Sequence, residues 1–295
     1  MANLLDIRRR IRSVKNTQQI TKAMKMVSAA KLKRAKDRAE AARPFAVKMT
    51  EVLTGLAARA GEDFKHPLLD RRGDERYLLV LVTADKGLAG AFNANLIKAA
   101  QAFLREHAGK TVEVIAVGRK GRDFFRRRAS VVGEHINLTG KGRVEYQEAA
   151  DLARDITRRF VEDEGIDKVF VIFNEFKSAL RQRVVVEQLL PVARVEEEGE
   201  AAADPSRPVT FVEYIYEQPP AEIFSRLLPR LIETQVYRAL LESVASEQGA
   251  RMTAMDAATK NAGELISNLT LYMNRVRQAS ITREIIEIVS GAAAL

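Results

Sequence analysis

The chain of 295 residues carries 48 Lys and Arg against 39 Asp and Glu, a formal net charge of +9, and 46% of its residues are hydrophobic. This composition is typical of a folded globular protein and excludes whole-chain disorder. The absence of Cys excludes a disulfide framework, a thiolate zinc site and a cysteine nucleophile. The His residues are scattered at His66, His107 and His135, so the sequence predicts no metal site.

Apolar runs in the sequence are short. The run Leu78–Val82 falls far below the roughly 18 to 20 apolar residues that a membrane-spanning helix needs. The first residues lack both the apolar segment of a secretory signal and the Ser-rich, acid-poor composition of a transit peptide. We therefore expect a cytoplasmic protein that spans no membrane.

The positive charge is concentrated at one end of the sequence. Residues 1–60 hold 15 Lys and Arg against 4 Asp and Glu, a net of +11, so the rest nets 9 − 11 = −2. A basic block attracts nucleic acid, anionic lipid or an acidic protein surface, and it can also be the solvated face of a helix. The cations that would face phosphates are Arg8, Arg9, Arg10, Arg12 and Lys15. They lack the interleaved aromatic residues of single-strand binders and lie in no recognisable DNA-binding motif, which favours a solvated face or an acidic protein partner over nucleic acid.

The first 58 residues are predicted to form one long helix. Apolar residues recur at steps of 3 and 4 from Leu4 to Val27 and again from Phe45 to Leu56, with a polar interruption at residues 17–19. Pro44 predicts a kink or a break near Ala42–Arg43, because proline removes a helical hydrogen bond and clashes with the preceding turn. Residues 59–75 are expected to form a linker.

Residues 76–217 are predicted to form an α/β domain of Rossmann type. Short runs rich in β-branched residues predict strands at Tyr77–Thr83, Val112–Val117, Lys168–Phe176 and Arg183–Leu190. Helices are expected at Asn93–His107 and Val144–Glu164. An edge strand is expected at Val209–Tyr216, and the acidic segment 196–205 is expected to be a surface loop.

Residues 218–295 are predicted to be helical after Pro219 and Pro220, with a bend or a later start at Pro229. Apolar steps of 4 and 3 from Ala262 to Ser280 indicate a coiled-coil seam. Small residues between 245 and 258 would let another helix approach closely. Helices of about 80 and 100 Å are too long to lie buried on a domain of about 14 Å radius of gyration, so we expect an exposed antiparallel coiled coil of the two termini.

The sequence offers little support for catalysis. The loop Thr83–Gly90 follows a predicted strand, where nucleotide-binding folds hold phosphate, but it matches neither glycine-rich phosphate motif. A structural turn is the favoured interpretation there and at Gly118–Arg122. Asp85 and Lys86 could act as a catalytic pair, although a charged surface turn is favoured. We predict no catalytic residue and no cofactor.

Three segments carry a family resemblance that covers essentially the whole chain. Asp6–Val27, Ala84–Gly90 and Arg277–Ala292 resemble the gamma subunit of the F-type ATP synthase. The resemblance implies a non-catalytic rotor shaft whose coiled coil enters a hexamer of alpha and beta subunits, while its α/β domain contacts the epsilon subunit and the membrane c ring. It further implies a peripheral location on the cytoplasmic face of the bacterial inner membrane, and a protein rather than a nucleic acid as the acidic partner.

The resemblance also assigns roles to individual residues. It implies contacts with a beta subunit by Lys22, Met24, Lys25, Arg277, Gln278 and Thr282. It implies that the apolar end of the shaft, represented by Ile285, Ile288 and Val289, lies in a hydrophobic sleeve of the hexamer.

Overall fold

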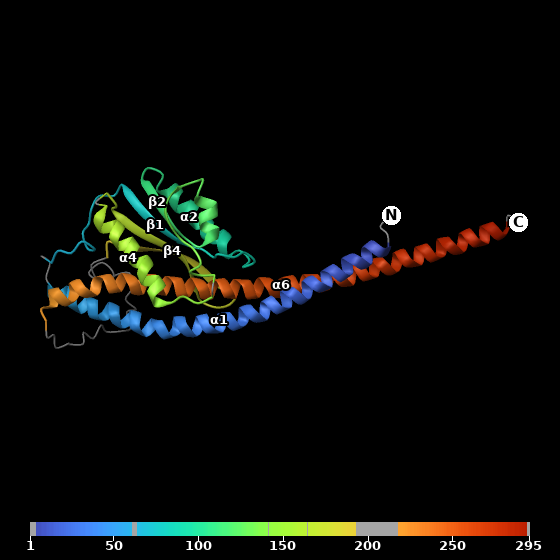
Figure 1. Cartoon of the computed structure of the whole chain (residues 1–295), viewed down its shortest axis with the longest axis horizontal. Coiled ribbons are helices and arrows are strands. Elements are labelled where there is room, and N and C mark those ends of the chain that lie inside the picture. Colours follow the sequence, from blue (N-terminus) through green and yellow to red (C-terminus); the bar gives the residue numbers. More distant parts are fainter. Residues whose placement is uncertain (1–3, 61–63, 141, 164, 193–217, 294–295) are drawn as a thin grey trace. The chain divides into compact units, whose positions relative to one another are not determined.

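The computed structural model describes residues 4–60, 64–140, 142–163, 165–192 and 218–293. The chain divides into two compact units, a terminal unit of Met1–Ala29 with Arg251–Leu295 and a central unit of Ala30–Ala250. Helices α1 (Leu4–Ala60) and α6 (Pro220–Ala293) each contribute residues to both units (Figure 1). None of the described helices is long and apolar enough to cross a membrane.

The central unit contains a five-stranded sheet of order β3-β2-β1-β4-β5. Strands β1 to β4 run parallel, and β5 pairs with β4 in the antiparallel direction. The strands are β1 (Arg76–Val82), β2 (Thr111–Val117), β3 (Ser130–His135), β4 (Lys168–Phe176) and β5 (Gln182–Leu190). This order is the first part of the Rossmann pattern, and it confirms the predicted fold class.

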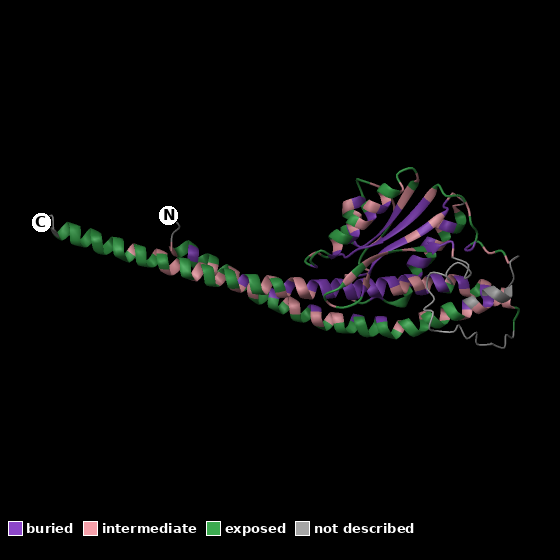
Figure 2. Cartoon of the chain, turned by 180° about the vertical axis from the view of Figure 1, so that it is seen from behind, coloured by how far each residue is buried: buried purple, intermediate pink, exposed green. Residues whose placement is uncertain are grey.

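The central strand β1 is buried on both faces, which explains its continuous apolar run. Leu78, Val80 and Val82 lie in the core beneath α4 (Tyr146–Glu162), together with residues of α1 and α6. Tyr77 and the alternate leucines of β1 lie in a second core with α2 (Phe92–Glu106) and α3 (Arg119–Phe125). Figure 2 shows the inner strands in the colour of buried residues. The sheet is therefore covered by helices on both sides.

Strand β4 continues beyond the end of its pairing with β1. The β1–β4 ladder ends at Leu81 and Ile172, whereas the β4–β5 ladder continues to Phe176. On the side that β1 leaves open, Ser246 Oγ of α6 donates to the carbonyl of Asn174 at 3.1 Å. Side chains of α6 therefore supply hydrogen bonds to the end of β4 where the parallel neighbour has ended.

The turn between β4 and β5 lies close to α6 at Gly249, where a Cβ atom would be 3.4 Å from the Cα of Ala179. The small residues between 245 and 258 were expected to let another helix pack closely. At Gly249 the closely packed neighbour is instead the β-turn between β4 and β5, because the two-stranded extension of the sheet packs against this part of α6.

In the terminal unit, residues 4–29 form the predicted antiparallel helix pair with the first part of 251–293, and α6 continues alone beyond the start of α1 (Figure 1). Gln18 Nε2 donates to the carbonyl of Thr259 at 3.4 Å, and Thr259 Oγ1 donates to Thr21 Oγ1 at 2.8 Å. Lys25 Nζ lies 2.6 Å from Asp256 Oδ1. Polar groups thus take part in the contact between these helices beside buried apolar residues such as Ile7 and Met255, and Gln18 of the polar interruption belongs to this contact.

Several local expectations from the sequence are corrected. Helix α1 continues through Pro44 without the break expected near residues 42–43, and α6 starts at Pro220 and continues through Pro229. Buried Ala39 and Leu53 on either side of Pro44 hold α1 in place by packing. Strand β3 was not predicted. The expected strand at 209–216 and the acidic loop at 196–205 lie outside the described residues.

Candidate protein-interaction surface

Asp85, directly after β1, organises the loops at the carboxyl edge of the sheet. Its side chain is only 1% exposed. Oδ1 accepts the backbone N–H groups of Arg119 and Asn137, each at 3.1 Å, and Oδ2 accepts the N–H of Gly140 at 2.9 Å. The expectation of a charged surface turn is therefore wrong for Asp85, although Lys86 is exposed.

This arrangement argues against a phosphate site at the carboxyl edge. Folds of this type hold phosphate with backbone N–H groups at the ends of the strands. Here three such groups are bonded to the Asp85 carboxylate. A phosphate in the same place would meet a buried negative charge and donors that are already used. The side chains of Asp85 and Lys86 are also unsuited to act as a catalytic pair, since one is buried and the other is exposed.

The second glycine turn is structural, as expected. Gly118 has φ of +88°, and a Cβ atom there would lie 2.2 Å from the carbonyl oxygen of Thr83. The hydroxyl of Thr83 accepts the N–H of Gly121 at 2.8 Å. Close approach of α3 to the end of β1 therefore requires glycine at this turn.

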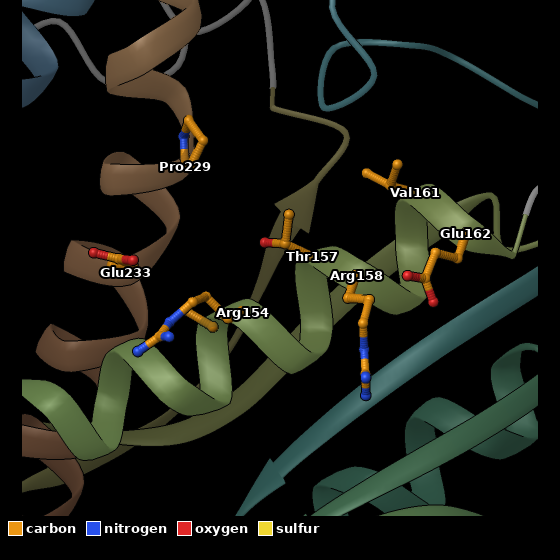
Figure 3. Close-up of a pocket in the computed structure, with 8 residues that line it drawn as sticks. Arg154, Thr157, Arg158, Val161, Glu162, Pro229 and Glu233 are labelled. Atoms are coloured by element: carbon orange, nitrogen blue, oxygen red, sulfur yellow. The ribbon is translucent and has the colours of Figure 1, made fainter.

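A groove of about 420 Å³ lies between α4 and α6 in the central unit. Figure 3 shows its side chains on the two helices. It is lined by Ala153, Arg154, Thr157, Arg158, Val161, Glu162, Pro229 and Glu233. Three of its charged groups have partners: Arg154 contacts Asp151 at 2.6 Å, Arg158 contacts Asp155 at 2.8 Å, and Glu233 accepts a hydrogen bond from the hydroxyl group of Tyr146 at 2.6 Å. The described lining holds no His, Cys or Ser, and no group of metal-ligating side chains occurs in the described part of the chain.

The terminal unit has an unusual distribution of polar and apolar residues. Thr21 and Ser28 of α1 are buried, whereas Ile20, Met26 and Val27 are exposed. The sequence pattern had assigned Ile20 and Val27 to the inner stripe of the helix. Contiguous patches of large exposed apolar side chains are typical of surfaces that bind other proteins.

The last turns of α6 carry a separate set of exposed apolar side chains. All residues from 281 to 292 are exposed, including the three predicted tip residues, of which Ile288 is 72% exposed (Figure 2). The further exposed apolar residues there are Ile281 and Ile286. The surface was predictable from the sequence only as an apolar end of the helix, and its exposure comes from the structure.

The polar residues assigned to partner contacts lie on the same unit. Arg277, Gln278 and Thr282 are exposed, and Thr282 Oγ1 donates to the carbonyl of Gln278 at 2.9 Å. Within the described residues, Arg277 has no ion-pair partner. These side chains therefore remain accessible at the outside of α6.

The three assigned residues of α1 differ in their surroundings. Lys22 is exposed and Met24 is half-buried. Lys25 forms the ion pair with Asp256, and hydrogen bonds from Lys25 and then Lys260 lower the pKa of that carboxyl group. Asp256 was not predicted as a partner of Lys25, because two residues separated by 231 positions leave no local signal in the sequence.

Comparison with known proteins identifies the family. A family model described as ATP synthase matches residues 3–295. The ATP synthase gamma chain of Solibacter usitatus (strain Ellin6076) is 55% identical over 100% of this chain and 99% of the relative. The chain belongs to the ATP synthase gamma chain family. A second relative of that name, from Geobacter sp. (strain M21), is 51% identical over 99% of this chain and 98% of its own.

Solved structures agree with this assignment. A chain of the central stalk and c-ring structure of Tetrahymena thermophila mitochondrial ATP synthase matches with a TM-score of 0.61 and 28% identity, covering 81% of this chain and 99% of that one. A chain of the Euglena gracilis mitochondrial ATP synthase has a TM-score of 0.66 at 19% identity, covering 99% and 94%, which supports the fold. The family resemblance of the three sequence segments is confirmed.

Proposed function

We propose that this chain is the central-stalk rotor of an ATP synthase. It couples proton-driven rotation of a membrane c ring to conformational cycling of catalytic beta subunits, and it makes or breaks no phosphate bond itself. Its partners are a hexamer of alpha and beta subunits, the epsilon subunit and the c ring. It acts as a peripheral component on the cytoplasmic face of the bacterial plasma membrane. Family membership over residues 3–295 supports this proposal.

The observation that carries the proposal is the exposed apolar end of α6 in the terminal unit. Ile285, Ile288 and Val289 are all more than half exposed. Leaving such side chains in water is unfavourable by about 25 cal/mol for each Å² of apolar surface, so a surrounding partner is favoured. Apolar contacts are also non-directional, and a shaft can turn within an apolar sleeve without breaking a fixed set of hydrogen bonds.

The exposed polar residues provide the orientation-dependent contacts in this mechanism. Arg277 and Gln278 lie on one side of α6 and meet a different beta subunit at each angle of rotation. A contact of this kind shifts a conformational equilibrium only by its differential affinity for the two states. Moving a subunit from 1:99 to 99:1 needs about 5.5 kcal/mol, which several charged and polar contacts acting together can supply.

The test uses the complex assembled with the cognate subunits in inverted membrane vesicles. Arg277→Ala with Gln278→Ala should preserve assembly and lower the number of protons pumped per ATP hydrolysed. The matched control, Gln101→Ala with Arg105→Ala, removes the same exposed residue types from α2 and should leave pumping unchanged.

Two results would count against the proposal. Failure of the unaltered chain to co-purify with alpha and beta subunits would refute the rotor function. Normal pumping by the variant with both substitutions on α6 would refute the contact roles of Arg277 and Gln278 alone.

A further inference from the structure

One face of α6 in the central unit carries a row of polar side chains bonded to β4 and β5. Arg238, Glu242 and Ser246 are spaced four residues apart, which places them on the same face of the helix. We call these three residues the α6 polar row. Arg238 Nη2 donates to Glu187 of β5, and Ser246 donates to the carbonyl of Asn174 in β4.

Glu242 is the central member of the row and joins three elements. Its side chain is 7% exposed. Oε2 accepts the backbone N–H of Phe176 at 2.9 Å, and Oε1 accepts Arg43 Nη2 of α1 at 3.0 Å. A buried carboxylate is costly unless it is paired and hydrogen-bonded, and here both oxygens have donors. One side chain therefore links α6 to the end of β4 and to α1.

The buried neighbours of the row on α6 are both apolar and polar. Leu241, Val244 and Ala245 are almost fully buried, and so are the polar Ser243 and Glu247. Contacts between the apolar side chains stabilise packing but fix the rotation of a helix only weakly, because they have no direction. Buried polar contacts are the groups that can specify a single register. The row can therefore specify one register of α6 in the central unit, which apolar packing alone does not do.

We propose that the α6 polar row fixes the register of α6 on the β4–β5 pair and carries torque between the sheet and the helix. This inference rests on the rotor function proposed above. At a helix radius of about 5 Å, a slip of about 20° would move the surface of α6 by roughly 2 Å. That displacement takes a hydrogen bond of 2.9 Å beyond its normal range, so all three contacts resist the slip together. The residues of the row are positioning residues and touch no substrate.

The experiment removes both charges of the Glu242–Arg43 pair, in which Glu242 is buried and Arg43 is half exposed. Glu242→Met combined with Arg43→Met roughly keeps the total side-chain volume and leaves neither charge without its partner, which is the kind of replacement that is often compatible with stability. The matched control is Glu222→Met with Arg226→Met, which removes an exposed pair from the same helix. Each form is assembled into the full complex, and ATP hydrolysis, proton uptake and amide exchange at Phe176 are measured.

We expect the variant that lacks the Glu242–Arg43 pair to assemble and to hydrolyse ATP at about the normal rate. Its amide exchange at Phe176 should rise roughly 10-fold, because a charge-assisted hydrogen bond is lost. Its proton uptake per ATP should fall at least about 3-fold, as slipping of α6 wastes rotation. The exposed-pair control should match the unaltered complex in every measurement.

Normal proton uptake per ATP together with faster exchange at Phe176 would overturn the proposal, because the row would then be structural only. An equal loss of coupling in the exposed-pair control would also overturn it. If the variant with both methionines does not assemble, Glu242→Gln is the deciding variant. Its amide oxygen still accepts the N–H of Phe176, but the ion pair with Arg43 is lost. The proposal requires that this variant lose part of its proton uptake per ATP. If the unaltered complex itself does not couple, the rotor function has failed rather than the role of the row.

Discussion

The buried carboxylate of Asp85 allows a quantitative prediction. Replacing it with Asn keeps one oxygen, which can still accept the N–H groups of Arg119 and Asn137. The new NH₂ group then faces the N–H of Gly140 and the hydroxyl of Thr139, which Oδ2 contacts at 2.9 and 3.4 Å. Loss of a hydrogen bond to a charged group costs about 1.5 to 3 kcal/mol, and an unsatisfied buried donor costs about 1 to 3 kcal/mol. We expect Asp85→Asn to lower the free energy of unfolding by about 3 kcal/mol.

The assay is urea unfolding of the full chain, followed by circular dichroism. In thermal unfolding, a loss of about 3 kcal/mol corresponds to a decrease in Tm of roughly 6 to 12 °C for a unit as long as the central unit. Asp123→Asn is the matched control, because Asp123 is 58% exposed and its ion pair is with Arg122 on the surface. It should change stability by less than about 0.5 kcal/mol. A loss below about 1 kcal/mol for Asp85→Asn would refute the role of its carboxylate in holding the loops.

Two further predictions concern a glycine turn and an ion pair. Gly118→Ala should cost about 3 kcal/mol of unfolding free energy, because its Cβ would overlap a carbonyl oxygen, whereas Gly109→Ala has open space and should be nearly neutral in the same urea titration. Lys25→Met should raise the pKa of Asp256 toward its usual value of about 3.9, measured by NMR titration. In the unaltered chain the depressed pKa stabilises the folded state above about pH 4, and this contribution is lost as the pH falls through the folded-state pKa. An unchanged pKa after Lys25→Met would contradict the pairing.

The sequence predicted the elements that have strong periodicity. Strand β1 is a continuous apolar run because it is buried on both faces, and the long helices follow from apolar steps of 3 and 4. Strand β3 was missed, since Ser130–His135 contains Gly133 and ends in polar residues. The break expected at Pro44 did not occur, because packing on both sides of a proline can outweigh its cost of about 3 kcal/mol in a helix.

The candidate site was predicted less completely than the fold. The family resemblance pointed to the apolar end of α6 and to Arg277 and Gln278, which the structure shows to be exposed, while their contacts with partners stay predictions. Periodicity assigned Ile20 to the inside of the helix pair, whereas the structure places Thr21 there and leaves Ile20 exposed. The burial of Asp85 was also missed, because its partners lie in two loops that follow later strands. Such contacts depend on tertiary structure and leave no local pattern.

The continuation of β4 beyond β1 has a consequence for solubility before assembly. An open strand edge offers unpaired N–H and carbonyl groups to any extended chain, and it can start aggregation. The carbonyl of Asn174 and the N–H of Phe176 are occupied by side chains of α6. A buried carboxylate at the same place also disfavours the approach of another strand. These contacts thereby protect a stretch of sheet edge from pairing with other copies of the chain before assembly.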